Sequence, residues 1–478
     1  MRYTSLNAIR EEIGRGTLSC RQLTERYLQN IAEKRHLNAF LEVFEEEALR
    51  RAEEVDVKLR EGRAGKLAGM VIGIKDVLAY EGHALQASSQ ILNGFQSLYT
   101  ATAVQRLLNE DAIIIGRQNC DEFAMGGSNE NSSFGPALNE ADTTRVPGGS
   151  SGGSAVAVQA DLCLASIGSD TGGSVRQPAS FCGVVGMKPT YSRISRYGLI
   201  AYASSFDQIG VITQSVEDAA LLLEVMAGGD EFDSTVSQRP VPAYSQHLTL
   251  DKPIRIGYIR ESLESAGLNA EVKTAIEGVI SQLKEQGHTV EAVDFPLLQY
   301  IVPTYYILTT AEASSNLGRY DGVRYGFRSE NATDLASLYK KTRSEGFGKE
   351  VQRRIMLGTF VLSADYYDAY YTKAQQVRRL IKEKTDELLQ QYDFLVLPTA
   401  PTTAFKIGEN TKDPLAMYLE DVFTVQANLA GIPAISLPIG HDAAGLPIGV
   451  QLMTKAFGEE QLFAFSKQVM DYQKQVTA

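Results

Sequence analysis

Short apolar runs alternate with helix-like segments along the first half of the chain. The runs that predict buried strands are residues 69–78, 112–119 and 164–170. The segments with a helical pattern are residues 19–35, 45–61 and 154–163. Because neighbouring parallel strands need a crossover, usually a helix, this order predicts βαβ units in an α/β fold. We therefore expect a central mixed sheet that is largely parallel and covered by helices.

The second half continues the alternation. The predicted strands are residues 254–259, 289–296, 394–401 and 433–440. The predicted helices are residues 215–227, 269–286 and 351–391. Glycine weakens a helix by about 1 kcal/mol relative to alanine, so we expect a break in the last helix near Gly358.

Composition and charge narrow the class of protein. The 478 residues are 44% hydrophobic and 22% charged, as in a soluble globular protein. No run approaches the roughly 18–20 apolar residues of a membrane span. The net charge of −12 argues against a general nucleic-acid clamp, which needs a basic face.

Cysteine and histidine usage excludes several kinds of site. The four cysteines form no CxxC pair or disulfide-like pattern, which favours a reducing compartment. Because no signal segment or Arg-rich leader precedes the first helix, we expect a cytoplasmic protein. The five histidines have no metal-ligand spacing, so we expect no metal site, and they offer few candidates for a Ser-His-Asp triad. No Walker A loop or GxGxxG fingerprint indicates bound ATP or dinucleotide.

Glycine and serine are concentrated in one segment, GGSSGGSAVAVQADLCLASIGSDTGGS, which begins at Gly148 and ends at Ser174. Glycine clusters allow a backbone with positive φ or a close approach to a ligand. Each cluster has a serine, Ser150 or Ser174, in front of a predicted helix. A hydroxyl beside the free N–H groups of a helix start suits acyl transfer.

Lys75 interrupts the apolar run VIGIKDVL. Its ammonium could reach water, pair with a carboxylate such as Asp76, or be neutral and act as a base. To act as a base near neutral pH, Lys75 must lose about 3 pKa units, which burial can supply. Position alone favours the structural alternatives, whereas the combination with two serines on glycine-rich turns favours catalysis.

Each serine also has a structural alternative, because serine is a common helix N-cap. Ser150 or Ser151 would then open a helix through Ala160, and Ser174 a helix through Ala179. The overlapping GxSxG matches in this tract are weak, since no suitable histidine follows them. For either serine alone, capping is the simpler explanation.

The segment from residue 148 to residue 190, GGSSGGSAVAVQADLCLASIGSDTGGSVRQPASFCGVVGMKPT, resembles the amidase signature family. The resemblance implies one large α/β/α domain over residues 1–478. It implies N-terminal helices in 1–65, a signature core in about 66–228, and a C-terminal half in about 251–478 that completes the sheet and the pocket.

The resemblance also implies a Ser–cisSer–Lys triad. By position, Ser174 is the nucleophile, Ser150 relays the proton from a cis peptide unit, and Lys75 is the base. The oxyanion hole is expected from the N–H groups of Thr171, Gly172, Gly173 and Ser174. No metal takes part.

Four further blocks are similar to one branch of this family, the A subunits of glutamyl-tRNA(Gln) amidotransferases. The blocks are residues 119–136, 312–326, 350–374 and 413–438. This similarity implies hydrolysis of glutamine within a heterotrimer with B and C subunits. The B subunit would bind ATP, Mg and the charged tRNA and amidate glutamyl-tRNA(Gln), and in some members also aspartyl-tRNA(Asn). No cofactor is expected in this chain.

The same similarity implies a pocket for a zwitterion. Arg354 matches a residue that binds the α-carboxylate, Asp421 one that binds the α-ammonium, and Tyr305 a pocket tyrosine. The adjacent Tyr306 leaves the register of the tyrosine open. Without the resemblance, each would be an ordinary surface charge or core tyrosine.

Two other functions remain open from the sequence. A stand-alone amidase could use the same chemistry on an aryl, aliphatic or peptide amide, but it would not need Arg354 and Asp421 to hold an amino acid. A non-catalytic scaffold could retain the fold, but Lys75, Ser150 and Ser174 are all present.

Overall fold

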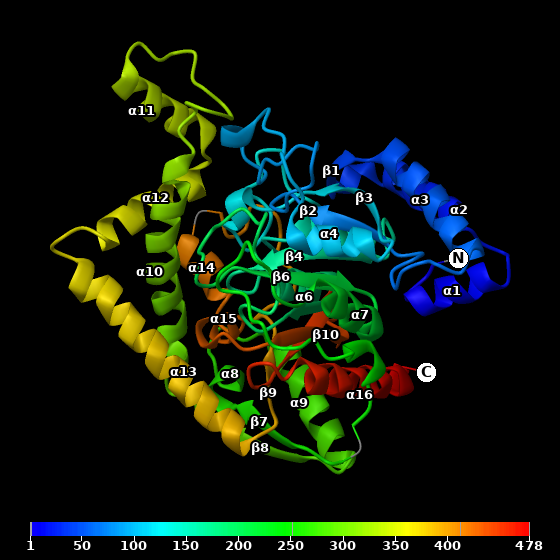
Figure 1. Cartoon of the computed structure of the whole chain (residues 1–478). Coiled ribbons are helices and arrows are strands. Elements are labelled where there is room, and N and C mark those ends of the chain that lie inside the picture. Colours follow the sequence, from blue (N-terminus) through cyan, green and yellow to red (C-terminus); the bar gives the residue numbers. More distant parts are fainter. Residues whose placement is uncertain (1, 251, 412, 478) are drawn as a thin grey trace.

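One mixed sheet contains the eleven strands of the described residues. The computed structural model describes residues 2–250, 252–411 and 413–477 (Figure 1). The strand order is β1-β3-β2-β4-β6-β5-β10-β11-β9-β7-β8. The strands are β1 (Phe40–Val43), β2 (Val71–Lys75), β3 (Ile113–Gln118), β4 (Ala165–Asp170), β5 (Val185–Lys188), β6 (Gln208–Thr213), β7 (Arg255–Ile259), β8 (Thr289–Val293), β9 (Phe394–Pro398), β10 (Ala434–His441) and β11 (Pro447–Met453).

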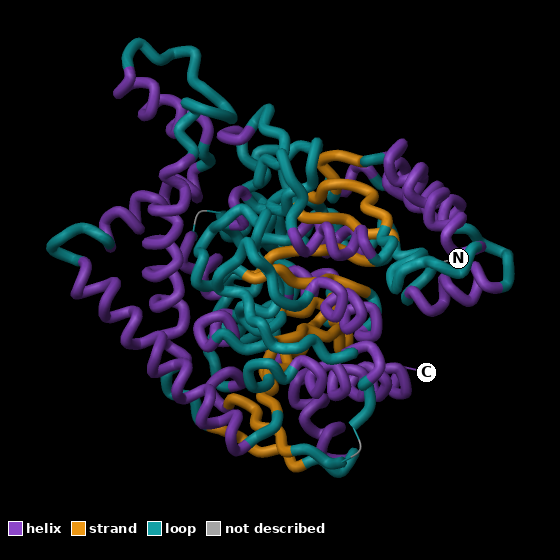
Figure 2. Tube along the Cα trace, in the orientation of Figure 1, coloured by secondary structure: helices purple, strands orange, loops and turns teal. Residues whose placement is uncertain are grey.

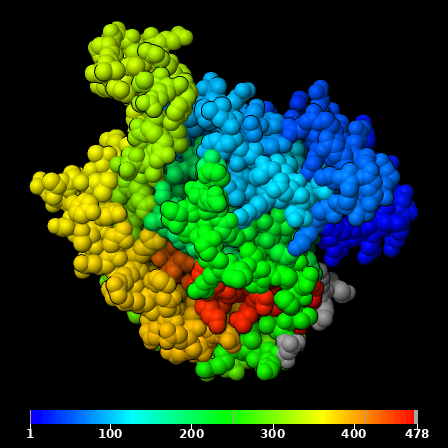
Figure 3. All heavy atoms as spheres, viewed as in Figure 1, coloured from blue at the N-terminus to red at the C-terminus, as the bar shows by residue number. Residues whose placement is uncertain are grey.

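Helices surround this sheet (Figure 2). They are α1 (Leu6–Gly14), α2 (Cys20–Glu33), α3 (Glu45–Arg60), α4 (Thr102–Asn109), α5 (Gly152–Gln159), α6 (Arg176–Cys182), α7 (Val216–Met226), α8 (Arg260–Leu263), α9 (Ala270–Glu285), α10 (Leu298–Asn316), α11 (Leu335–Gly346), α12 (Lys349–Val361), α13 (Lys373–Gln391), α14 (Pro414–Leu419), α15 (Val425–Ala430) and α16 (Glu459–Thr477). Helices α10, α12 and α13 form a layer beside the sheet, and the segment with α11 projects from the body (Figures 1 and 3).

The α/β class and the central mixed sheet covered by helices are confirmed, but the largely parallel character is wrong. Six of the ten neighbouring strand pairs are antiparallel and four are parallel. No helix separates β5 from β6, and a short turn joins β10 to β11. Connections without a crossover helix make neighbouring strands antiparallel.

The parallel strands β2 and β4 position the site. Ile72 lies opposite Ala165 and Ile74 opposite Ile167, so the carboxyl ends of the two strands lie side by side. Both strands are buried along their whole length, in agreement with their apolar sequences. Open α/β sheets bind ligands beyond the carboxyl ends of their strands.

The predicted break near Gly358 is confirmed, but it lies after Val361 and not at the glycine itself. Gly358 lies inside α12, where a Cβ atom would stand 1.9 Å from the carbonyl oxygen of Thr310 on α10. Glycine therefore allows two helices to cross closely here. The helical region is interrupted after Val361 and resumes through a π-helical turn, Asp368–Thr372, into α13.

The sheet continues from the first half of the chain into the second. β5 pairs with β10, with Met187 opposite Ile435. Buried apolar residues form a core that extends from Leu6 to Val469. The division into N-terminal helices, core and C-terminal half stays a prediction. Within the described residues, no helix combines the length and apolar character needed to cross a membrane.

Candidate active site

Lys75 ends strand β2 and is completely buried. Its Nζ donates hydrogen bonds to Oγ of Ser150 at 2.7 Å, of Ser169 at 2.9 Å and of Ser151 at 3.0 Å. Asp76 faces away and pairs with Arg117 at 2.8 Å. The structure therefore contradicts both structural alternatives, an ammonium that reaches water and an ion pair with Asp76.

The surroundings of Lys75 favour its neutral form more than water does. Burial lowers the pKa of Lys75 to about 8, and nearby acidic groups such as Asp121 and Asp170 oppose this shift. The neutral amine is therefore well populated near pH 8 and can accept a proton. The oxygen closest to Nζ is Ser150 Oγ, so Ser150 is the residue best placed to donate that proton to Lys75.

The turn that holds Ser150 leaves no room for a side chain at Gly149. The Gly149–Ser150 peptide bond is cis. A Cβ atom on Gly149 would stand 2.0 Å from Oδ2 of Asp121. Ser151 is the N-cap residue of α5, yet its side chain makes no capping bond; it accepts from Lys75 and donates to the carbonyl of Ser169 at 3.2 Å. The predicted helix start at Ser151 is therefore confirmed, but neither Ser150 nor Ser151 caps the helix with its side chain.

Ser174 lies on a second turn, which a buried carboxylate organises. Asp170 accepts hydrogen bonds from the N–H of Gly173 at 2.9 Å and of Val175 at 3.2 Å. It also forms an ion pair with Arg176 at 2.9 Å, with both side chains fully buried. The helix that follows has Val175 as its N-cap, so Ser174 is no cap either.

A hydrogen bond joins the turn of Ser150 to the turn of Ser174, and the turn of Ser174 has backbone N–H groups without a partner in the described structure. The N–H of Ser151 donates to the carbonyl of Ser174 at 3.1 Å. Ser174 is 8% exposed, and its Oγ makes no hydrogen bond within the described part of the chain. The amides of Thr171, Gly172 and Ser174 have no partner there either, whereas that of Gly173 is bound to Asp170. Of the four amides expected in an oxyanion hole, three are thus free.

Tyr305 packs directly on the turn of Ser174. A Cβ atom on Gly172 would stand 2.5 Å from Cζ and Oη of Tyr305. On the other side, Thr424 donates to the carbonyl of Gly172 at 2.7 Å, and a Cβ atom on Gly173 would stand 2.2 Å from its Oγ1. The two glycines therefore let α10 and the segment before α15 approach the turn.

Arg354 projects from α12 into a cage of aromatic rings. Its guanidinium lies 5.2–5.6 Å from the ring centres of Tyr202, Tyr306 and Tyr418. Its Nη1 donates to the hydroxyl of Tyr202 at 2.8 Å and its Nε to Glu350 at 2.9 Å. Nη2 has no partner among the described residues, which leaves one edge of a buried cation for an anionic ligand.

Asp421 supplies the opposite charge. The hydroxyl of Tyr306 donates to its Oδ2 at 2.9 Å, and the ring of Tyr306 also faces Arg354. Burial raises the pKa of Asp421 to about 7, against the lowering effects of this hydrogen bond and of Arg354. Tyr305 thus lies against Gly172, while Tyr306 touches both charged residues.

Three comparisons place this chain among known proteins. The amidase family model matches residues 22–463. The chain belongs to the amidase family. The A subunit of the glutamyl-tRNA(Gln) amidotransferase of Chlorobium luteolum is 51% identical over 98% of this chain and 97% of that protein.

Solved structures confirm the amidase fold. The A subunit of the glutamyl-tRNA(Gln) amidotransferase of Thermotoga maritima is 40% identical, with a TM-score of 0.77 over 94% of this chain and 92% of that one. The peptide amidase of Stenotrophomonas maltophilia is 30% identical, with a TM-score of 0.81 over 97% and 96% of the two chains. Since the less identical amidase superposes slightly better, overall shape does not separate the branches of the family, and sequence identity favours the amidotransferase branch.

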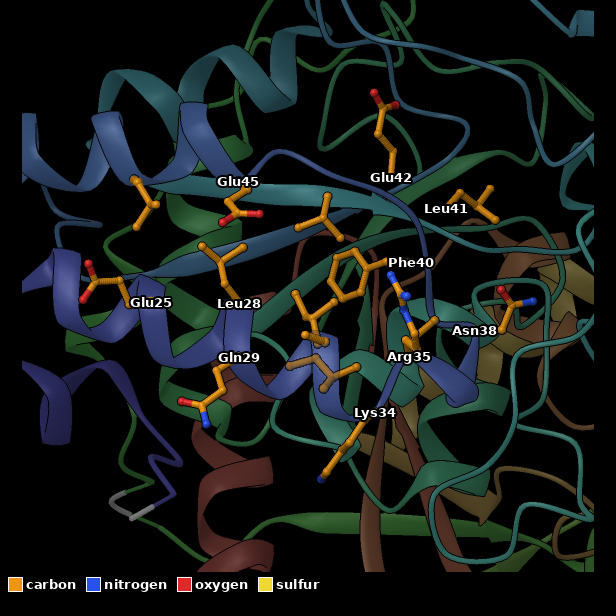
Figure 4. Close-up of a pocket in the computed structure, with 16 residues that line it drawn as sticks. Glu25, Leu28, Gln29, Lys34, Arg35, Asn38, Phe40, Leu41, Glu42 and Glu45 are labelled. Atoms are coloured by element: carbon orange, nitrogen blue, oxygen red, sulfur yellow. The ribbon is translucent and has the colours of Figure 1, made fainter.

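A large cavity of this amidase lies away from the predicted site. It has a volume of about 890 Å³ and lies between α2, the edge strand β1 and the start of α3, with Leu28, Phe40 and Glu45 in its wall (Figure 4). None of the predicted site residues lines it. In the described parts of the chain, no three His, Cys, Asp or Glu side chains are arranged to hold a metal ion.

Several residues of the amidase site were not predicted from the sequence. Ser151 and Ser169 complete the shell around Lys75, and Asp170 and Arg176 support the turn of Ser174. Ser169 had a signal, because it lies at the end of a predicted strand beside that of Lys75. No sequence signal indicated the partners of Arg176, since Asn428 and Gln451 are 252 and 275 residues away in sequence.

Proposed function

We propose that this chain is the glutamine-hydrolysing A subunit of a glutamyl-tRNA(Gln) amidotransferase. The observation on which this rests is that Arg354 and Asp421, one a cation and one an acid, both contact Tyr306, next to the tyrosine that packs on the Ser174 turn. Free glutamine has one carboxylate and one ammonium on its α-carbon. Arg354 can bind the carboxylate and Asp421 the ammonium, and Tyr306 contacts both side chains. Relatives named as A subunits of this enzyme, about half identical over nearly the whole chain, support the same assignment.

In the proposed reaction, Ser174 Oγ attacks the side-chain amide carbon of glutamine. Its proton passes to Ser150, whose own proton passes to neutral Lys75, 2.7 Å away. The carbonyl oxygen becomes an oxyanion, which the free amides of Thr171, Gly172 and Ser174 would stabilise. Asp170 holds the amide of Gly173 and thereby fixes the turn.

The tetrahedral intermediate then breaks its carbon–nitrogen bond. The proton on Lys75 returns through Ser150 to the leaving nitrogen, and ammonia departs while the glutamyl group stays on Ser174 as an ester. A water molecule then attacks the ester and gives its proton to the same relay. The relay returns this proton to Ser174 Oγ as the bond between Oγ and the acyl carbon breaks and glutamate leaves. In sum, glutamine and water become glutamate and ammonia, and the site returns to its starting state.

Partners complete the proposed enzyme. The B subunit would receive the ammonia and bind ATP, Mg and charged tRNA. It would amidate glutamyl-tRNA(Gln) and, in enzymes that also accept it, aspartyl-tRNA(Asn). The C subunit would stabilise the heterotrimer, and the whole would act in the cytoplasm. The net charge of −12 on this chain fits a protein that leaves tRNA binding to its partner.

Replacing Arg354 with methionine tests the substrate. In the heterotrimer, we expect the KM for glutamine to rise about 10- to 100-fold, because a buried charge-assisted contact to the α-carboxylate is lost. Lys349→Met is the matched control, since it removes an exposed cation from the same helix. It should leave the KM unchanged.

The alternative is a stand-alone amidase, which the fit to the peptide amidase would also allow. Hydrolysis of 4-carbamoylbutanoate, which is glutamine without its α-ammonium, separates the two. We expect native enzyme to prefer glutamine strongly and Asp421→Asn to lose that preference. Equal hydrolysis of both compounds by native enzyme would favour the stand-alone amidase.

A further inference from the structure

Glu122 connects two parts of the site that are far apart in sequence. It begins the short helix η3 (Glu122–Ala124) and is 2% exposed. Its Oε2 and Oε1 accept the N–H of Gly348 at 2.8 Å and 3.1 Å, and Ser89 Oγ also donates to it. The contact therefore bridges 226 residues of sequence.

Gly348 is the N-cap residue of α12 and has no side chain with which to cap it. The first N–H groups of a helix lack internal partners, and a carboxylate there satisfies them and interacts well with the helix dipole. Glu122 supplies this cap from another part of the chain. A Cβ atom on Gly348 would stand 2.4 Å from its Oε2, so glycine is needed for the carboxylate to reach the backbone.

The residue before Glu122 holds the other end of the site. The N–H of Asp121 donates to the carbonyl of Ser150 at 3.1 Å. Its carboxylate accepts the N–H of Asn129 at 2.9 Å and lies where a side chain on Gly149 would be. Asp121 and Glu122 are thus adjacent residues, of which one binds the serine turn and the other binds the helix with Arg354.

We propose that Glu122 is a positioning residue that sets the place of Arg354 relative to the catalytic serines by capping α12. Arg354 lies six positions after Gly348 on this helix, and its side chain is held by Glu350, which Tyr418 also contacts. That the ligand of Arg354 is glutamine rests on the proposed function. None of Lys75, Ser150 and Ser174 contacts Glu122, so glutamine binding should depend on it more than the chemical step does.

The first test is kinetic and uses the heterotrimer. For Glu122→Ala we expect the KM for glutamine to rise about 5- to 30-fold, the upper part of the range that corresponds to the free energy of a lost helix cap, with kcat within about threefold of native. The rate at which a fluorophosphonate labels Ser174 should stay unchanged, because that probe has no carboxylate for Arg354. A variant damaged throughout the site would lose labelling as well, and this result would overturn the proposal.

Glu130→Ala is the matched control. Glu130 belongs to the same loop and also accepts a backbone N–H, that of Gly408 at 2.7 Å, but it touches no part of α12. We expect its KM to be native. Glu122→Gln keeps an acceptor for Gly348, so its KM for glutamine should lie between those of the native enzyme and Glu122→Ala. The capping role would be contradicted if Glu122→Gln had the same KM as Glu122→Ala, or if Glu130→Ala had a raised KM.

A second test does not depend on the identity of the substrate. Amide hydrogen exchange of residues 348–353 should be faster in Glu122→Ala than in native chain, even if glutamine is not hydrolysed. In an Arg354→Met background, Glu122→Ala should add no further rise in KM, because both substitutions act through the contact between Arg354 and the substrate carboxylate. Unchanged exchange, or additive effects on KM, would overturn the proposal while leaving the glutaminase function intact.

Discussion

Replacing Lys75 with methionine is expected to lower kcat for glutamine hydrolysis about 1,000- to 10,000-fold. Methionine fills a similar volume but cannot accept the proton that Ser150 would pass on. Because burial lowers the pKa of Lys75 to about 8, the ammonium predominates at lower pH and the neutral base at higher pH. The native rate should therefore rise with pH through this value, and the residual rate of Lys75→Met should not.

A second buried lysine provides the control. Lys188 donates to the carbonyl groups of Pro189 and Ile432, and burial lowers its pKa to about 7. Lys188→Met should lower the melting temperature but leave kcat per folded molecule native. If Lys75→Met keeps more than a tenth of the native kcat, or both variants lose it equally, Lys75 is not the base.

Replacing Asp170 with asparagine is expected to lower the free energy of unfolding by about 3–5 kcal/mol, because a buried guanidinium loses its counter-charge. Burial alone would raise the pKa of Asp170, but the Arg176 guanidinium holds it well below its usual range. The same carboxylate binds the amides of Gly173 and Val175, so kcat should fall as well. Urea unfolding and single-turnover hydrolysis measure the two effects separately.

Asp294→Asn is the comparison for stability. Asp294 pairs with Arg260 at 2.8 Å, but both side chains are largely exposed. Exposed pairs contribute little, so the midpoint of unfolding should not move. Equal midpoints for Asp170→Asn and native chain would show that the network under the Ser174 turn is not needed for stability.

The strands under the site were predictable, whereas part of the sheet was not. β2, β3 and β4 fall inside the apolar runs 69–78, 112–119 and 164–170, because strands buried on both faces need continuous apolar sequence. The antiparallel pairs were missed because hydrophobic pattern shows where a strand lies and not which strand it joins. β5 and β6 were not predicted at all, and they are the strands that lie between β4 and β10.

Gly358 does not itself interrupt α12, although the helical region ends three residues later, whereas the glycines at the turns mark close approaches as predicted. At Gly358 the missing side chain permits helix crossing, which no local pattern reveals. At Gly172 and Gly173 the cluster marked a true close approach, although the approaching residues, Tyr305 and Thr424, lie more than 100 residues away. Local sequence therefore identified where the backbone is crowded, and only the fold shows what crowds it.

The central claim is that Ser174 of this chain hydrolyses glutamine to supply ammonia to a partner protein. The most direct test measures ammonia and glutamate released from glutamine by the heterotrimer, with native chain and with Ser174→Ala. We expect native complex to release both in equal amounts and the variant to release neither, while the variant still amidates glutamyl-tRNA(Gln) when ammonium is added. No release by native complex, or undiminished release by Ser174→Ala, would contradict the claim.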